Sequence, residues 1–164
     1  MIYILTGDIR TGKTSALLDW INDRNDVDGL LCPDNEKGKR YFLKVKSKEE
    51  ILLEVETEVI DQEVATVGPF RFLKSAFKKG NDYLIAKGKE YKSQYLIIDE
   101  IGKLELKNEG LHWAVKTLIP NFMHKVDKHL IIVIRSTLLN DCIQHYNIEN
   151  YTVLGEEELN TLLP

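Results

Sequence analysis

The 164-residue sequence contains only two cysteines, Cys32 and Cys142, and no apolar run as long as a membrane-spanning helix. Two distant thiols form neither a disulfide framework nor the paired spacing of a zinc site, so we expect buried thiols in a reducing cytoplasm. The first apolar run, residues 2–5, has no basic residue before it and no small-residue cleavage site after it, unlike an export signal. These absences favour a cytoplasmic domain without a membrane segment.

An excess of positive charge is also missing. The net charge at pH 7 is -4, which gives no general reason to expect a nucleic-acid partner. Residues 36–48 are a local exception, with six basic residues and one acidic residue. We favour a solvated hairpin with a charged edge, which resists aggregation, and keep a phosphate- or polynucleotide-binding patch as the alternative. The four histidines lack metal-ligand spacing, and we expect surface or structural roles for them: His112, His124, His129 and His145.

Apolar runs of strand length alternate with segments of helical periodicity. Strands are expected at residues 2–6, 95–99, 129–134 and 150–154. Helices are expected at residues 13–24, from Phe70 to Leu84 with a break at 80–82, at 111–119 with a stop at Pro120, at 137–146 and at 155–163. The alternation predicts one α/β domain over residues 1–164, with a mostly parallel sheet and helices on both faces.

Residues 29–67 are rich in β-forming residues and are expected to form a β-rich insertion. Glu54, Glu56 and Glu58 alternate with Val55, Thr57 and Val59, as in a half-exposed strand. Residues 47–50, SKEE, also fit a capping box, so a helix that begins there is a competing hypothesis.

Directly after the first strand, residues 7–14 read GDIRTGKT and match the pattern G-x-x-x-x-G-K-[ST]. Glycines in such a loop let backbone amides turn toward phosphate oxygens, and the following helix adds its positive end. Lys13 is expected to reach the β- and γ-phosphates of a nucleoside triphosphate, and the Thr14 hydroxyl to ligate Mg²⁺. The candidate binding residues are Gly7, Asp8, Ile9, Arg10, Thr11, Gly12, Lys13, Thr14 and Ser15.

A second apolar strand, YLII, ends in Asp99 and Glu100. Such a strand alone is a weak signal, but it is the usual partner of a phosphate-binding loop. We expect Asp99 to hold Mg²⁺ through water, because magnesium keeps several of its waters. Glu100 is the candidate base that polarises a water for in-line attack on the γ-phosphorus.

A cation is needed where charge builds up on the phosphate oxygens, and the chain has five arginines. Arg135 follows the strand 129–134 directly and leaves the sheet at the carboxyl edge, where ligands of open α/β sheets bind. We therefore favour Arg135 as the catalytic cation over Arg10, which we expect to point into solvent. Ser136 is interpreted as a helix cap. Tyr146 and Tyr151 are interpreted as structural aromatics, although either could stack on a base.

The segment DEIGKLEL, residues 99–106, resembles DEIGKMEL, which is nearly a signature of a small P-loop nucleoside-triphosphatase family. VDGLLCP at 27–33 and TVGPFRF at 66–72 resemble its VDGFYTEE and VGQYVVD segments. The resemblance implies a P-loop α/β core with a β-rich insertion and slow hydrolysis of several nucleoside triphosphates to diphosphate and phosphate. It also implies that Gly7, Gly12, Lys13, Thr14, Asp99 and Glu100 take the roles given above.

Lys103 and Glu105 match the signature too, either as an ion pair that pins the loop after the strand or with a direct role. The sequence departs from the family at three places. The family loop is closer to GPPGVGKTT, so Arg10 stands where a glycine is usual. The arginine-rich stretch after the VDG segment is thinned here to Arg40, and the chain between Arg40 and Phe70 aligns poorly.

The favoured function is therefore Mg²⁺-dependent hydrolysis of nucleoside triphosphates, ATP or GTP among them, with broad base specificity and slow turnover. A kinase that passes the γ-phosphate to a nucleoside, a nucleotide or a polynucleotide end is one alternative, although it usually needs an arginine-rich lid. A non-catalytic switch that binds nucleotide is another. The sequence leaves the preferred base, the partner and the oligomeric state open.

Overall fold

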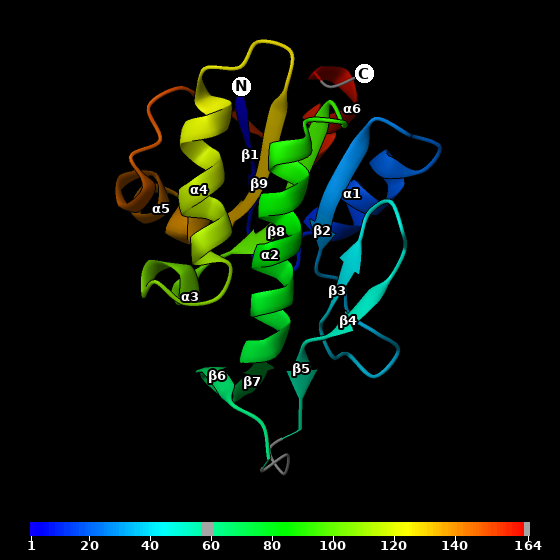
Figure 1. Cartoon of the computed structure of the whole chain (residues 1–164), viewed down its shortest axis with the longest axis vertical. Coiled ribbons are helices and arrows are strands. Elements are labelled where there is room, and N and C mark those ends of the chain that lie inside the picture. The colour runs from blue at the N-terminus through cyan, green and yellow to red at the C-terminus, as the bar shows by residue number, and fades with distance from the viewer. Residues whose placement is uncertain (57–60, 163–164) are drawn as a thin grey trace.

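The computed structural model describes residues 1–56 and 61–162. Its main sheet has seven strands, in this spatial order: β10 (Tyr151–Leu154), β1 (Ile2–Gly7), β9 (His129–Arg135), β8 (Tyr95–Ile101), β2 (Val27–Leu31), β3 (Tyr41–Lys44) and β4 (Glu50–Leu52). The first five of these are parallel, and β3 and β4 continue the sheet as antiparallel neighbours. Strand β9 thus lies between β1 and β8, so the two predicted site segments are next-but-one neighbours (Figure 1).

The helices cover both faces of this sheet, as the sequence predicts. They are α1 (Lys13–Ile21), α2 (Lys74–Glu90), α3 (Lys103–Leu106), α4 (His112–Met123), α5 (Leu139–Tyr146) and α6 (Leu159–Leu162), with 3₁₀ turns at Ser136–Leu138 and Glu156–Glu158. Helices α2 and α4 lie side by side on one face (Figure 1). No helix among the described residues is both long and apolar enough to cross a bilayer.

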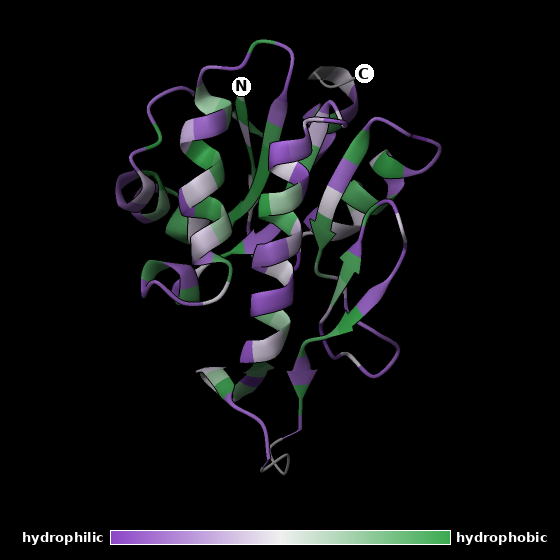
Figure 2. Ribbon diagram, viewed as in Figure 1, coloured by the Kyte–Doolittle hydropathy of each residue, from purple (hydrophilic) through white to green (hydrophobic). Residues whose placement is uncertain are grey.

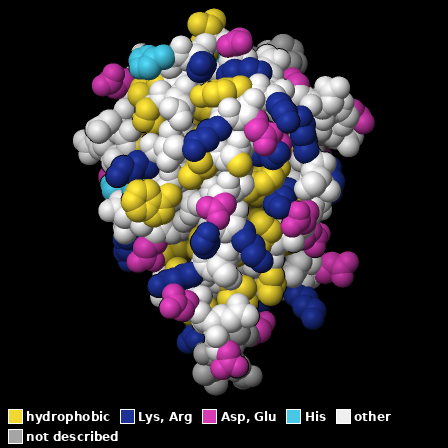
Figure 3. Space-filling view, viewed as in Figure 1, with side chains coloured by type: hydrophobic (Ala, Val, Ile, Leu, Met, Phe, Trp, Pro, Cys, Tyr) yellow, Lys and Arg dark blue, Asp and Glu magenta, His cyan; other side chains and the backbone are white. Residues whose placement is uncertain are grey.

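Strand β9 shows why both faces need a cover. Ile132 and Ile134 pack into the core under α2, α4 and α5, while Ile131 and Val133 pack into the core with α1 and α6. A strand buried on both faces must be apolar at every position, not only at alternate ones. Figure 2 shows this contrast, with β9 almost wholly hydrophobic and α2 polar on its outer side. On the outer face of α2 and α4, basic and acidic side chains are interspersed (Figure 3).

A second, three-stranded antiparallel sheet lies below the N-terminal end of α2 (Figure 1). It consists of β5 (Glu54–Val55), β7 (Phe70–Leu73) and β6 (Val64–Val67). The prediction of a helix from Phe70 is therefore wrong for its first turn. Gly68 adopts φ 56° in the turn between β6 and β7, and cross-strand pairing then outweighs the helical spacing of the following apolar residues. The helix begins at Lys74.

Two further predicted helix ends are absent from the structure. Gly80 and Asn81 lie inside α2, where the Asn81 amide donates to the carbonyls of Phe77 and Gly110 and its oxygen accepts from the Ala114 amide. Pro120 lies inside α4, on its exposed side. The proline leaves one backbone carbonyl without its intrahelical hydrogen bond, but this carbonyl lies on the solvent-exposed side of the helix. Helix α4 continues to Met123 because its opposite side is buried.

The strands from residues 29–67 divide between the two sheets. Strand β2 is fully buried in the main sheet, and residues 47–50 form a turn into β4, not a helix. The alternation predicted for residues 54–59 is wrong at its start, because Glu54 is buried and accepts a hydrogen bond from the Arg40 amide. Thr57, Glu58 and Val59 lie outside the described residues. Helix α1 ends at Ile21, three residues earlier than predicted, and Arg24 pairs with Asp26 beyond it.

Candidate active site

The phosphate-binding loop leaves the carboxyl end of β1 beside the end of β9. Gly7 and Arg135 are register partners in this pair of parallel strands. Helix α1 begins at Lys13, directly after the loop, with Gly12 in the left-handed region at φ 99°. The loop thus has the strand–loop–helix context that the sequence motif requires, and Arg135 leaves the sheet at the predicted edge.

Inside the loop, the buried side chain of Lys13 turns back onto the chain. Its Nζ donates to the carbonyl of Asp8 at 2.6 Å and of Gly7 at 3.3 Å. Thr11 Oγ1 donates to the Asp8 carbonyl at 3.1 Å, which tightens the same turn. The ammonium group that is predicted to meet phosphate is therefore already held at the centre of the loop.

Arg10 is exposed and adopts φ 58°, a backbone conformation that favours glycine. This explains why glycine is usual at the corresponding position of the family that the loop resembles. The exposure agrees with the expectation that Arg10 points into solvent, and Arg10 is one of the residues that line the cleft above the loop.

Thr14 and Asp99, 85 positions apart in sequence, are brought together by the fold. Thr14 Oγ1 donates to Asp99 Oδ2 at 2.8 Å, and the backbone amide of Cys32, just after β2, donates to the same oxygen at 3.1 Å. The other oxygen, Asp99 Oδ1, is buried and has no hydrogen-bond partner among the residues that the structure describes. Burial raises the pKa of Asp99 to about 6, against the opposing effect of its two hydrogen bonds.

This carboxylate fits a magnesium site, because a buried oxygen without a partner needs a cation or a donor. Among the described residues, no group of three or more His, Cys, Asp or Glu side chains could hold a metal ion. A divalent ion at Asp99 and Thr14 would therefore complete its shell with water and substrate oxygens, as Mg²⁺ does at nucleotide sites.

Glu100 faces a different neighbour. The pairing of β8 with β9 shifts register between Ile98 and Ile101, where the two acids lie. Arg135 Nε donates to Glu100 Oε1 at 2.7 Å, and both side chains are about one-quarter exposed. The candidate base and the candidate cation are thus joined in one ion pair at the sheet edge.

Ser136 does not cap the turn that follows β9, contrary to the sequence prediction. Its Oγ donates to Asp8 Oδ1 at 2.7 Å, and the turn has no side-chain cap. The bond ties the end of β9 to the phosphate-binding loop, because these two segments leave adjacent strands at the same edge. Tyr146 is structural, as predicted: its hydroxyl bonds to buried His112 and to the Glu105 carbonyl.

A cleft of about 570 Å³ opens over these groups, lined by residues 9–15 and by Cys32, Arg40, Glu100 and Arg135, among others. Sequence reasoning missed the contributions of Cys32 and Arg40. Both belong to the segment around β2 and β3, which reaches the site only because β2 pairs with β8. Gly29 permits that pairing, since a Cβ there, at φ 128°, would lie 2.2 Å from the Ile97 carbonyl oxygen.

The signature residue Glu105 binds backbone amides instead of Lys103. Its Oε2 accepts from the Gly102 amide at 2.8 Å and its Oε1 from the Leu111 amide at 2.9 Å. The side chain is buried, and burial raises the pKa of Glu105 above its ordinary value. Glu105 thus fixes the loop that follows β8.

Glu105→Gln should lower the free energy of unfolding by about 1–3 kcal/mol at pH 7, because the amide group can accept from only one of the two backbone donors. A carboxyl whose pKa is raised by folding stabilises fully below its unfolded pKa and less as the pH rises through the folded pKa. The advantage of the parent over the variant should thus be larger near pH 4 than at pH 7 in urea unfolding. The opposite trend would mean that the two hydrogen bonds outweigh burial.

The fold and the site together define a P-loop NTPase with a carboxylate pair on the second strand from the loop. A model of the NTPase family matches residues 2–162, so the chain belongs to this family. The fold is similar to the crystal structure of THEP1 from the hyperthermophile Aquifex aeolicus, with 14% identity and a TM-score of 0.70 over 99% of this chain and 95% of that chain.

It is also similar to the solution structure of a human cancer-related nucleoside triphosphatase, with 17% identity and a TM-score of 0.67 over 99% of this chain and 94% of that chain. No curated protein sequence matches the chain. The family resemblance and the fold predicted from the sequence are confirmed. Family membership supports nucleoside triphosphatase activity in general.

Proposed function

We propose that the protein hydrolyses nucleoside triphosphates to diphosphates and phosphate, with Mg²⁺ held at Thr14 and Asp99. The observation that carries this proposal is the 2.8 Å contact from Thr14 to Asp99, beside the buried Asp99 Oδ1, for which the described part of the chain supplies no hydrogen-bond partner. When bound, Mg²⁺ would be held by Thr14 and Asp99 and would neutralise charge that develops on the phosphate. The loop amides and Lys13 would bind the β- and γ-phosphates.

Glu100 is proposed as the general base. The water oxygen bonds to the γ-phosphorus, the bond to the β–γ bridging oxygen breaks, and the diphosphate leaves with that oxygen. Glu100 accepts the water proton. Arg135, which holds Glu100 at 2.7 Å, would move onto the γ-phosphate and release the carboxylate for this task.

The proposal includes slow turnover and broad base specificity, and the same geometry supports both. Lys13 must exchange the carbonyls of Gly7 and Asp8 for phosphate, and Arg135 must leave Glu100, before the site is competent. The described residues that line the cleft include no aromatic side chain. A base bound there would lack an aromatic stacking partner, so little would distinguish one base from another.

The direct test is phosphate release from ATP, GTP, CTP and UTP, with Mg²⁺ and with excess EDTA. Release from several triphosphates that stops with EDTA is expected. Tight nucleotide binding with no release would favour the non-catalytic switch and would contradict the hydrolase proposal.

Lys13→Ala should weaken triphosphate binding about 10- to 100-fold, because a charge-assisted phosphate contact is removed. Titration calorimetry on the parent and the variant measures the change. Lys79→Ala, which removes an exposed lysine from α2, is the matched control and should bind as the parent does. Equal affinities for the parent and Lys13→Ala would show that the loop lysine does not contact phosphate.

A further inference from the structure

A second cavity, of about 320 Å³, adjoins the phosphate cleft. Four residues line both spaces: Cys32, Arg40, Glu100 and Arg135. The second cavity therefore begins at the candidate base and cation and extends away from the phosphate-binding loop. Its volume lies in the range of small-molecule sites, about 300–1,000 Å³.

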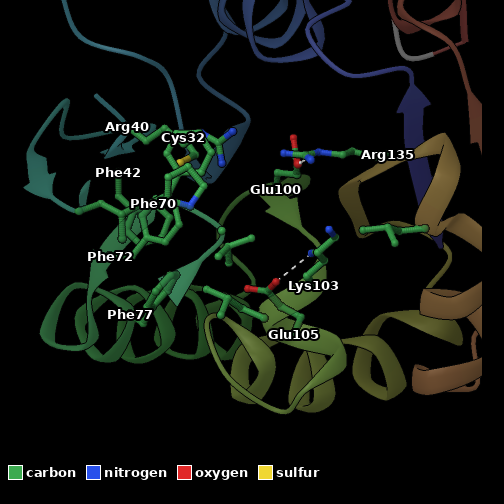
Figure 4. A pocket seen from close by; sticks show the side chains of 17 residues that line it. Cys32, Arg40, Phe42, Phe70, Phe72, Phe77, Glu100, Lys103, Glu105 and Arg135 are labelled. Atoms are coloured by element: carbon green, nitrogen blue, oxygen red, sulfur yellow. Dashed lines mark hydrogen bonds and ion pairs between the residues drawn. The ribbon is translucent and has the colours of Figure 1, made fainter. Parts of the chain in front are cut away.

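The far part of this cavity is aromatic. Phe42 comes from β3, Phe70 and Phe72 from β7, and Phe77 from α2, and Figure 4 shows them gathered on one side of the cavity. Adjacent ring centroids lie 5.8–6.4 Å apart, and Phe70 is 41% exposed. The Arg40 guanidinium lies 5.8 Å from the Phe70 ring centre and 6.0 Å from that of Phe72. Phe42 and Phe72 are almost fully buried, so within this aromatic wall the Phe70 ring and the Arg40 guanidinium offer the stacking surface, which favours a flat ring.

The near part of the cavity is charged. Glu100 and Arg135 face the aromatic wall from the opposite side, and Lys103 lies below them (Figure 4). The backbone of Arg40 is held in place because its backbone amide donates to the side chain of buried Glu54 at 2.8 Å. A ligand with a planar apolar end and a hydroxyl-bearing end matches this division in one orientation only, with its hydroxyl toward Glu100.

We propose that this cavity binds a nucleoside as a second substrate and that its hydroxyl receives the γ-phosphoryl group. The inference rests on the proposed function, since the phosphate donor is the triphosphate in the adjoining cleft. The nucleoside hydroxyl oxygen bonds to the γ-phosphorus, and the bond to the β–γ bridging oxygen breaks. The hydroxyl proton passes to Glu100, and the diphosphate leaves with the bridging oxygen and its electron pair.

A kinase usually needs an arginine-rich lid, and the five arginines are scattered along this sequence. The fold favours a kinase more than the sequence does, because Arg40 and Arg135, 95 positions apart, both line the phosphate cleft and the second cavity. One of them comes from the basic segment 36–48, the only candidate clamp in the sequence. Hydrolysis is then the reaction that occurs when water occupies the position of the nucleoside hydroxyl.

The test uses the full chain with γ-labelled ATP, Mg²⁺ and each of adenosine, guanosine, cytidine and uridine. Label is expected in the monophosphate of at least one nucleoside, beside free phosphate. ADP with Mg²⁺ should leave binding of that nucleoside unchanged in titration calorimetry, because the two sites are distinct. Label only in free phosphate, or nucleoside binding that competes with ADP, overturns the inference and leaves hydrolysis standing. A protein that neither binds nor hydrolyses triphosphates overturns both proposals.

Two variants locate the second site. Phe70→Ala removes an exposed stacking face and should raise the KM for the nucleoside about 5- to 100-fold. Leu138→Trp should fill the cavity and have a similar effect, by a different physical route. Trp113→Ala removes an aromatic that is 60% exposed on α4, and its KM should equal that of the parent. Equal KM values for all three variants and the parent would place the nucleoside elsewhere and overturn the inference.

Discussion

Glu100→Gln is expected to bind nucleoside triphosphates as the parent does but to release phosphate about 10²- to 10⁴-fold more slowly. A glutamine has nearly the shape of glutamate and still reaches the cleft, but it cannot accept the proton of the attacking water. Asp99, Thr14 and Lys13 are not altered, so the phosphate and metal contacts remain. The loss should therefore fall on the chemical step and not on affinity.

Single-turnover phosphate release, with enzyme in excess over labelled ATP, measures that step directly. The matched control is Glu109→Gln, an exposed acid after the same strand, which should turn over at the parent rate. A Glu100→Gln variant as fast as the parent would mean that another group takes the proton. Loss of binding instead of rate would mean that Glu100 holds the loop or the metal.

Arg135→Ala is expected to slow hydrolysis about 10³- to 10⁵-fold, the effect of removing a cation that stabilises charge on the transferred phosphoryl group. The position supports this role, because Arg135 is in register with Gly7 and its Nε lies 2.7 Å from Glu100 Oε1. Arg135→Lys keeps the charge but loses the planar fork, so it should recover only part of the rate.

Arg10→Ala is the natural comparison, since Arg10 is the arginine of the phosphate-binding loop itself and also lines the cleft. It is exposed, and its removal should change the rate far less than that of Arg135. A larger loss for Arg10→Ala would assign the catalytic cation to the phosphate-binding loop. Combining Arg135→Ala with Glu100→Gln should cost less than the sum of the two free-energy effects, because contacting groups do not act independently.

Local pattern was informative wherever a feature depended on neighbours in sequence. The strand–loop–helix at the start of the chain, the apolar strand before Asp99 and the strand before Arg135 are each continuous segments whose residue types dictate their form. The same holds for DEIGKLEL, whose match to the family needed no coordinates. Because these segments form parallel strands, their carboxyl ends lie at the same edge of the sheet.

Local pattern failed where a distant partner decided the outcome. Phe70 and Leu73 have helical spacing, but pairing of β7 with β5 and β6 makes them a strand. Glu54 was expected to be exposed to solvent, but it is buried and accepts a hydrogen bond from the Arg40 backbone amide. For Glu105 the sequence left an ion pair with Lys103 and a direct role open, and the structure shows neither contact but the amides of Gly102 and Leu111 bound to its two oxygens.

The amino-acid sequence by itself determined the class of this protein, because a phosphate-binding loop and an acid pair are encoded in short runs whose geometry is local. Tertiary structure alone decided which side chains share the site. Strand β2 brings Cys32 to Asp99, β9 brings Arg135 to Glu100, and the small sheet brings Phe70 to Arg40. These contacts join residues tens of positions apart, and only the burial and pairing of whole strands sets such distances.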